Sequence, residues 1–165
     1  MRAYGEYIRE TKRLLQSYRK MKVAAVNLTE EMEAVERLLQ DEGIAAVRYG
    51  DDGGRGTGEL TATEAAAARR IRMRERITQL RERRDEMERT VRAIDRALES
   101  LCYEDAELIR GRYMCGLSWA QVAEQRNYTE KWAREKGGKV LQDVALMLFG
   151  VTVRPIQLNL VYNCG

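Results

Sequence analysis

The fold is decided by residues 117–141, which read LSWAQVAEQRNYTEKWAREKGGKVL. Ser118 is a candidate helix N-cap, because its hydroxyl can accept a hydrogen bond from a backbone N–H of the first turn. Trp119, Val122 and Ala123 then recur at spacings of three and four, so they share one face of a short helix. We therefore predict a short capped helix that begins after Ser118 and packs through this apolar face.

A turn and a second, longer helix follow. Asn127, in the turn at 126–128, can take the left-handed conformation that otherwise calls for glycine. Thr129 can cap the next helix. On that helix we expect a polar side with Lys131, Arg134 and Lys136 and a buried side with Ala133, Val140 and Leu141. This layout is a helix-turn-helix, in which the second helix is offered to the major groove of DNA.

Further residues complete a pattern that resembles a known family. DAELIRGRY at 105–113 precedes GLSW at 116–119, and YT at 128–129 and GKVL at 138–141 follow. The pattern is similar to the sigma-70 region 4 domain of bacterial sigma factors, and more closely to the sigma-like phage and prophage transcriptional regulators of the RinA and ArpU kind. The closest match covers about a third of the chain, and the long helical N-terminal half is also similar. The resemblance implies a DNA-binding transcriptional regulator that acts near RNA polymerase.

The chain departs from that family pattern in its second helix. Lys136 stands where the family usually has an apolar residue, and Glu130 and Glu135 stand where basic residues are common. Gly137 adds a second glycine beside Gly138, and two glycines inside a helix cost roughly 2 kcal/mol relative to alanines unless packing requires them. These departures predict a weakened or altered DNA-reading helix.

Five residues of this helix are candidate DNA contacts. Lys131 and Arg134 are the expected base or phosphate contacts, and Thr129, Lys136 and Lys139 are expected on phosphates. We interpret Trp119, Val122, Tyr128 and Ala133 as core residues rather than contacts. The charges between Cys102 and Phe149 balance, so this half lacks a strong excess of positive charge. The alternative interpretation is a three-helix packing unit without a role in nucleic-acid binding.

Two long amphipathic helices precede this region. Apolar residues recur at alternating spacings of three and four over residues 4–39 and again over residues 66–101. This heptad spacing predicts an antiparallel coiled-coil hairpin. Its weaker seam positions are Thr11, Ala25, Arg70 and Arg84. Such positions favour a larger bundle with a second chain, so we expect a homodimer or a higher oligomer. The expected fold is all-α, with the hairpin at 1–101, the helix-turn-helix domain at 102–149 and a tail at 150–165.

Two segments lack a helical pattern. Residues 43–61 combine several glycines with Asp51 and Asp52, so we predict a mobile loop between the long helices. The spacing of a calcium-binding loop is missing. Residues 150–165 alternate apolar with polar side chains around Pro155, which predicts a short strand. This tail is expected to dock on the helices, to pair with another chain or to stay disordered.

Arginine is concentrated in the second long helix, between Arg69 and Arg96. Acidic residues are interleaved with these arginines on neighbouring turns, as Glu82 and Glu86 are with Arg89. We interpret this helix as a solvated, salt-bridged face, and a phosphate-binding stripe is the alternative. No DNA contact is assigned to it.

Composition excludes several classes of function. The chain has no histidine, and its cysteines, Cys102, Cys115 and Cys164, lack the spacing of a zinc site. No glycine-rich phosphate loop is present, so we predict no enzyme, no cofactor and no metal. The first residues lack the apolar core of a signal peptide, and no run approaches the length of a membrane span. These features predict a cytoplasmic protein without membrane contact.

Three hypotheses of function follow. The first is a sequence-specific transcriptional regulator of phage or prophage type that reads double-stranded DNA through the helix beginning at Thr129. The second is an interaction protein whose coiled coil contacts RNA polymerase. The third is a DNA-packaging subunit similar to a phage small terminase, which also joins helix-turn-helix units to oligomerising helices. Ring-like assembly would favour the third, and salt-sensitive binding of promoter DNA would favour the first.

Overall fold

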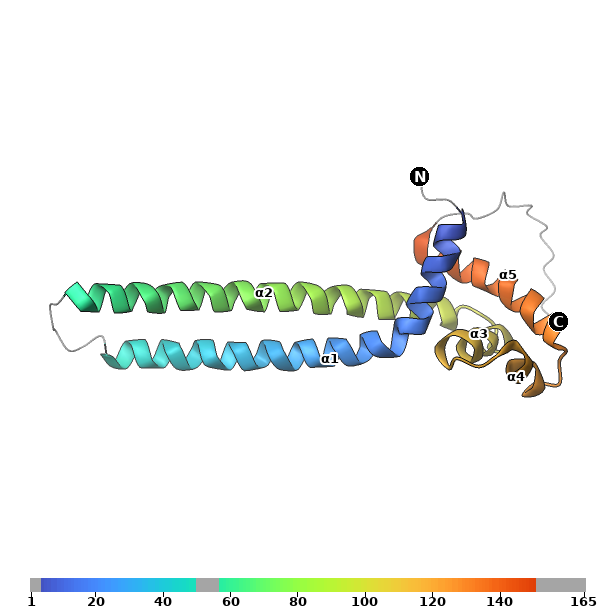
Figure 1. Cartoon of the computed structure of the whole chain (residues 1–165), viewed down its shortest axis with the longest axis horizontal. Helices are drawn as coiled ribbons and strands as arrows, with labels where there is room; N and C mark the ends of the chain where they lie inside the picture. Colours follow the sequence, from blue (N-terminus) through green and yellow to red (C-terminus); the bar gives the residue numbers. More distant parts are fainter. Residues whose placement is uncertain (1–3, 50–56, 151–165) are drawn as a thin grey trace. The chain divides into compact units, whose positions relative to one another are not determined.

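The computed structural model describes residues 4–49 and 57–150, and its regular structure is helical throughout these ranges (Figure 1). The elements in chain order are α1 (Tyr4–Tyr49), α2 (Thr57–Glu99), α3 (Tyr103–Ile109), the π-helical turn η1 (Arg110–Met114), α4 (Trp119–Glu124) and α5 (Glu130–Phe149). No strand occurs within the described ranges, which confirms the all-α class. None of the described helices combines the length and the apolarity that crossing a membrane requires.

The chain divides into two compact units. Unit 1 contains residues 1–19 and 90–165, and unit 2 contains residues 20–89. The first turns of α1 and the last turns of α2 therefore belong to the same unit as α3, α4 and α5. This division differs from the predicted boundary at residues 101 and 102, which assigned both long helices to one domain.

Contacts made by the first turns of α1 account for this division. The ring centroids of Tyr7 on α1 and Phe149 on α5 are 5.3 Å apart. The Tyr18 hydroxyl donates a 2.6 Å hydrogen bond to Oδ1 of Asp95 on α2, and this bond raises the pKa of Tyr18 to about 12. Thr11 is completely buried, and its hydroxyl donates to the Tyr7 carbonyl oxygen at 2.8 Å. Thr11 is therefore a satisfied core residue of unit 1.

The core of unit 1 receives side chains from each of its helices. Its fully buried members include Leu15 of α1, Ile94 of α2, Leu108 and Ile109 of α3, and Leu141 and Val144 of α5. Full burial of an aliphatic side chain of this size contributes roughly 1.5–3 kcal/mol. The long helices thus supply part of the core on which the C-terminal helices are built.

In unit 2, α1 and α2 lie side by side and run antiparallel (Figure 1). Met32, Ile77 and Leu80 form a buried cluster between them, and Leu28, Val35 and Leu39 pack against this cluster. All six are apolar residues of the two stretches with heptad spacing, 4–39 and 66–101, so this spacing identified the buried side of each helix. Each helix buries only that one side, because the described part of unit 2 contains no third helix.

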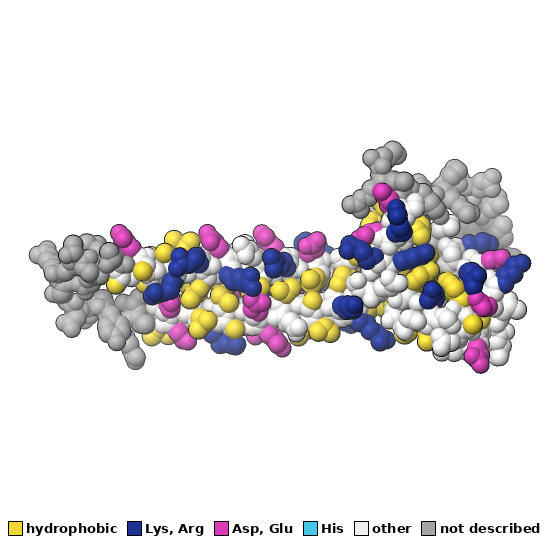
Figure 2. Space-filling model, in the orientation of Figure 1, with side chains coloured by type: hydrophobic (Ala, Val, Ile, Leu, Met, Phe, Trp, Pro, Cys, Tyr) yellow, Lys and Arg dark blue, Asp and Glu magenta, His cyan; other side chains and the backbone are white. Residues whose placement is uncertain are grey.

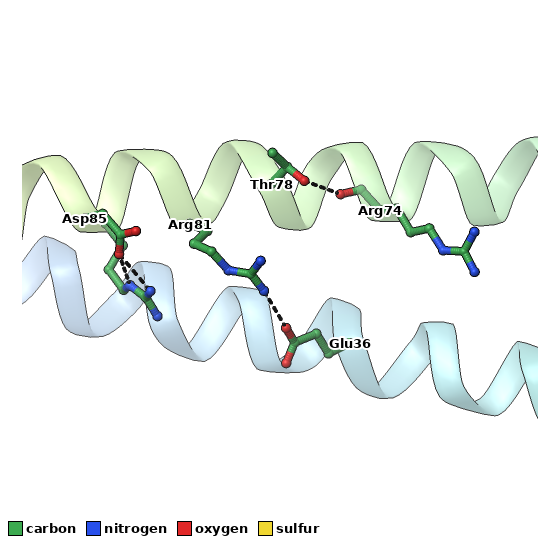
Figure 3. A network of polar contacts seen from close by, with 6 residues as sticks. Glu36, Arg74, Thr78, Arg81 and Asp85 are labelled. Atoms are coloured by element: carbon green, nitrogen blue, oxygen red, sulfur yellow. Dashed lines mark hydrogen bonds and ion pairs between the residues drawn. The ribbon is translucent and has the colours of Figure 1, made fainter.

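Ion pairs span the two helices beside this seam. They join Arg76 to Glu31 at 2.5 Å, Arg69 to Glu42 at 3.3 Å and Arg81 to Glu36 at 3.5 Å, and Figure 3 shows the Arg81–Glu36 contact. Basic and acidic side chains alternate along this face (Figure 2). Exposed pairs of this kind contribute about 0–1 kcal/mol each. They agree with the interpretation of the Arg-rich helix as a salt-bridged face.

The structure corrects the ends of the predicted loop at 43–61. α1 continues through Gly43 to Tyr49, and α2 already begins at Thr57. Residues 44–48, IAAVR, include good helix formers, and a single glycine costs about 1 kcal/mol, which a long helix tolerates. Residues 50–56, the centre of the predicted loop, lie outside the described residues, as does the predicted strand-like tail from residue 151 onward.

Candidate nucleic-acid interface

Both predicted helix caps are present. The Ser118 hydroxyl accepts a 3.1 Å hydrogen bond from the Gln121 backbone N–H, and Gln121 Oε1 accepts one of 2.8 Å from the Ser118 N–H. These reciprocal bonds form a capping box at the start of α4. The Thr129 hydroxyl accepts a 3.2 Å hydrogen bond from the Trp132 N–H at the start of α5. The first turns of α4 and α5 are thus fixed by residues that lie within four positions of each other.

The turn between α4 and α5 has the predicted left-handed residue. Asn127 has φ of 56°, and within the described ranges it is the one non-glycine residue with a positive φ. The next N–H, that of Tyr128, donates to the Ala123 carbonyl oxygen at 3.0 Å. Arg126 is held from outside the turn, because its guanidinium lies 3.3 Å from Glu107 Oε2 and 5.1 Å from the centre of the Tyr103 ring. The turn is therefore anchored to α3 as well as to α4.

A small core joins α3, α4 and α5. Leu108, Val122, Ala123 and Ala133 are buried together, and Leu117, Trp119 and Trp132 pack against them. The predicted core positions Val122 and Ala133 are confirmed, and Trp119 packs against the same core. Val140 and Leu141 are also buried, as predicted. The opposite side of α5 is left facing outward.

Trp119 explains one of the two helix-interior glycines. A β-carbon at Gly137 would lie 2.7 Å from Cζ3 of the Trp119 ring, closer than two carbon atoms can approach without strain. The ring also meets Tyr113 edge-on, with centroids 6.1 Å apart, and lies 5.5 Å from the guanidinium carbon of Arg112. Packing thus requires glycine at position 137. At Gly138 a β-carbon would have no neighbour within 4 Å, so packing gives no reason for that glycine.

The outward face of α5, which we call the α5 face, contains residues spaced by three, four, seven and eight. They are Lys131, Arg134, Glu135, Gly138 and Lys139. The side chains of Lys131 and Lys139 are exposed and form no ion pair with another described residue. Arg134 is exposed and pairs with Glu130 one turn earlier. Three of the five predicted contact residues therefore share one exposed face.

Lys136 does not belong to that face. Its ammonium nitrogen lies 3.1 Å from Oδ1 of Asp105 on α3, and the Lys136 side chain is partly buried. Asp143, about two helical turns further along α5, is exposed, but partial desolvation and the Asp105 carboxylate raise its pKa, which Lys136 opposes. Lys136 therefore compensates two carboxylates, which gives a structural reason for its place at a position where the family pattern is apolar.

Thr129 is exposed at the start of α5, but its hydroxyl oxygen is engaged in capping. It therefore lies where a phosphate contact is expected, and its first task in the free protein is to order the helix. Its substitution would change both the cap and any contact, so Thr129 is a poor position for testing DNA binding alone.

The structure corrects the interpretation of Tyr128 as a core residue. Tyr128 keeps 36% of its surface exposed, and its ring stacks on Trp132, with centroids 4.0 Å apart and an interplanar angle of 31°. Tyr128 directly precedes the N-cap, and Trp132 lies four residues on. An aromatic pair at this spacing across an N-cap indicates side-chain contact over the first turn. The spacing of this aromatic pair can be read from the sequence, but the periodicity of apolar residues alone does not reveal it.

Comparisons of the chain with protein-family models, with curated proteins and with solved structures find no match. The resemblance to sigma-like regulators thus depends on the sequence motifs and enters below as part of a proposal.

Proposed function

We propose that this protein is a DNA-binding transcriptional regulator of phage or prophage type, which reads double-stranded DNA through α5. One observation carries the proposal. Two capped helices share a core through a left-handed turn, and the α5 face, which lies opposite that core, presents Lys131 and Lys139 without a described ion-pair partner. A helix in this position is the recognition helix of a helix-turn-helix.

The proposed contacts follow from position on α5. Lys131 and Arg134 lie in its first two turns and are assigned to base edges or phosphates, whereas Lys139 is assigned to a phosphate. The Arg134–Glu130 pair is exposed to solvent and costs little to open. Lys136 is removed from the contact set because Asp105 binds its ammonium group.

Charge balance limits the affinity of a single copy. Three cationic contacts predict a slope of about −3 for the logarithm of the binding constant against the logarithm of salt concentration. Such a slope is shallow for a regulator, so we propose that two copies bind adjacent half-sites, joined through unit 2 as a homodimer. The antiparallel packing of α1 and α2 in unit 2 supports this proposal, because each helix leaves its outer side uncovered.

Selection from random duplexes, followed by gel-shift titration, tests the function. We expect the protein to enrich one sequence, and that sequence to occur near the protein's own gene. Lys131→Ala and Arg134→Ala should each weaken binding by about 1–3 kcal/mol for a base contact. For a phosphate contact, the loss should be uniform across sequences and the salt slope shallower. Lys136→Met is the matched control, because it removes a cation from the same helix but not from the α5 face.

The control variant separates an effect on stability from an effect on DNA binding. Lys136→Met should change stability and leave the salt slope unaltered. If no duplex is enriched over random sequence, and the Lys131 and Arg134 variants bind as the wild type does, the proposal that α5 reads DNA is wrong.

A second candidate is an interaction protein that contacts RNA polymerase through unit 2. It is favoured by the apolar side chains that unit 2 exposes, which are Val23, Val26, Leu38, Ile44 and Ile71. Each of them is more than half exposed. Direct binding of purified RNA polymerase, lost in a Leu38→Glu and Ile44→Glu double variant whose oligomeric mass is unchanged, would support this candidate.

A further inference from the structure

The exposed aromatic ring of Tyr128 lies at the entrance to α5 and has no role in the core. Tyr128 keeps 36% of its surface exposed, although the large apolar ring of a tyrosine favours burial. The neighbours along the chain are Asn127 in the turn and the N-cap Thr129. Tyr128 is therefore placed at the end of α5 that enters the groove in a helix-turn-helix complex.

The ring is held in one orientation before any partner binds. The backbone of Tyr128 is fixed by the hydrogen bond from its N–H to the Ala123 carbonyl oxygen and by the left-handed conformation of Asn127. Its side chain is fixed by stacking on Trp132. Trp132 is itself half-buried against the core that joins α3, α4 and α5. Such preorganisation lowers the entropic cost of a contact made by the Tyr128 ring.

The chemistry of the ring selects what it can recognise. An aromatic face offers apolar surface, and its stacking partner already covers part of it. The apolar group that the major groove presents is the C5 methyl of thymine, whereas the other base edges present hydrogen-bond donors and acceptors. We infer that Tyr128 is a specificity-determining residue that reads the C5 methyl of a thymine, while Lys131 and Arg134 supply the polar contacts. This inference rests on the proposed function of α5.

The tyrosine hydroxyl offers a different contact, a hydrogen bond to a phosphate oxygen, which would carry no sequence information. Two substitutions separate these contacts. Tyr128→Phe keeps the ring and removes the hydroxyl, and Tyr128→Ala removes both. Recognition of a methyl group should persist in Tyr128→Phe and be lost in Tyr128→Ala.

The experiment replaces thymines by deoxyuridines, one at a time, in the duplex that the wild-type protein selects from a random pool. Deoxyuridine removes the methyl group and leaves base pairing unchanged. We expect one position in each half-site at which deoxyuridine weakens wild-type binding about fourfold, the effect of losing one buried methyl group. Tyr128→Phe should keep this discrimination, and Tyr128→Ala should bind both duplexes equally.

Leu146→Ala is the control, because Leu146 has a similar exposed fraction, 37%, and lies near the end of α5 opposite to Tyr128. It should leave the discrimination intact. Equal binding of thymine and deoxyuridine duplexes by the wild type would overturn the inference while DNA reading by α5 stands. If Tyr128→Phe loses the discrimination, the hydroxyl and not the ring is responsible, and this result also overturns the inference. If no duplex is selected at all, the proposed function and this inference both fail.

Discussion

At the scale of single residues, the short-range packing around Trp119 determines which substitutions α5 tolerates. The Trp119 ring occupies the space that a β-carbon at Gly137 would need, whereas Gly138 faces open space. These neighbouring glycines therefore have opposite physical roles, although both interrupt the same helix. The pair offers a direct test of the packing between α4 and α5.

Gly137→Ala should lower the free energy of unfolding of unit 1, and Gly138→Ala should raise it. The first forces Trp119 to move at a cost of about 1–3 kcal/mol, partly offset by better helix propensity, and the second gains up to about 1 kcal/mol. Chemical denaturation followed by tryptophan fluorescence measures both, since Trp119 and Trp132 both lie in unit 1. Equal effects of the two substitutions would show that the Trp119 ring does not pack against Gly137.

The carboxyl group of Asp143 makes the stability of unit 1 depend on pH. Partial desolvation and the Asp105 carboxylate raise the pKa of Asp143, so the folded state binds this proton more tightly than the unfolded state does. Its stabilising contribution is present at acidic pH and is lost as the pH rises through the raised pKa. Asp143→Asn should therefore be more stable than the wild type at neutral pH, and this advantage should disappear in acid. Thermal unfolding across this pH range measures the difference, and a gain that persists in acid would exclude the titration of Asp143 as its cause.

At the scale of secondary-structure elements, unit 2 depends on a single seam between α1 and α2. Its buried members include Met32, Ile77 and Leu80, and the ion pairs beside them are exposed and weak. Almost all of the stability of this pair of helices must therefore come from the apolar seam. Within unit 2, α2 carries two isoleucines in contrasting positions, one in the seam and one outside it.

Ile77→Asp should destabilise unit 2 by several kcal/mol, because Ile77 is 8% exposed and the new carboxylate would be buried without a partner. Ile71→Asp is the control, because Ile71 is 54% exposed. It should leave the helix content unchanged. Circular dichroism during thermal unfolding distinguishes the two variants. A similar loss of helix in both would mean that Ile71 is covered in solution.

At the scale of the whole molecule, each unit has its own core, and α1 and α2 contribute to both units. Unit 1 has buried side chains from each of its helices, whereas unit 2 buries one side of each of its two helices. A pair of helices with one narrow seam gains from association with a second pair, because the outer apolar side chains then leave water.

We therefore expect a homodimer whose stability depends on protein concentration. The thermal midpoint should rise with concentration, because association stabilises the folded state by mass action. A Val23→Glu and Val26→Glu double variant should become monomeric and keep its helix content, since both residues are exposed in the single chain. Light scattering after size-exclusion chromatography measures the mass. A strict monomer at high micromolar concentration would contradict the homodimer and leave the antiparallel packing of α1 and α2 intact.

The sequence alone was sufficient to predict the local structure around the caps, the turn and the helix faces. The caps at Ser118 and Thr129, the left-handed Asn127 and the buried side of each long helix were all predicted correctly. These features depend on hydrogen bonds and spacings within about four residues, so the information lies in a short stretch of chain. The ends of the long helices were misjudged, because a glycine-rich composition does not show where a stable helix stops.

The tertiary structure alone decided how residues far apart in the sequence meet. It separated Lys136 from the other candidate contacts through Asp105, and it required glycine at position 137 through Trp119. It also placed Tyr7 against Phe149, so the first turns of α1 belong to unit 1. Each of these outcomes depends on which side chain a distant helix presents. Periodicity shows which side of a helix is buried, but it does not identify the partner that buries it.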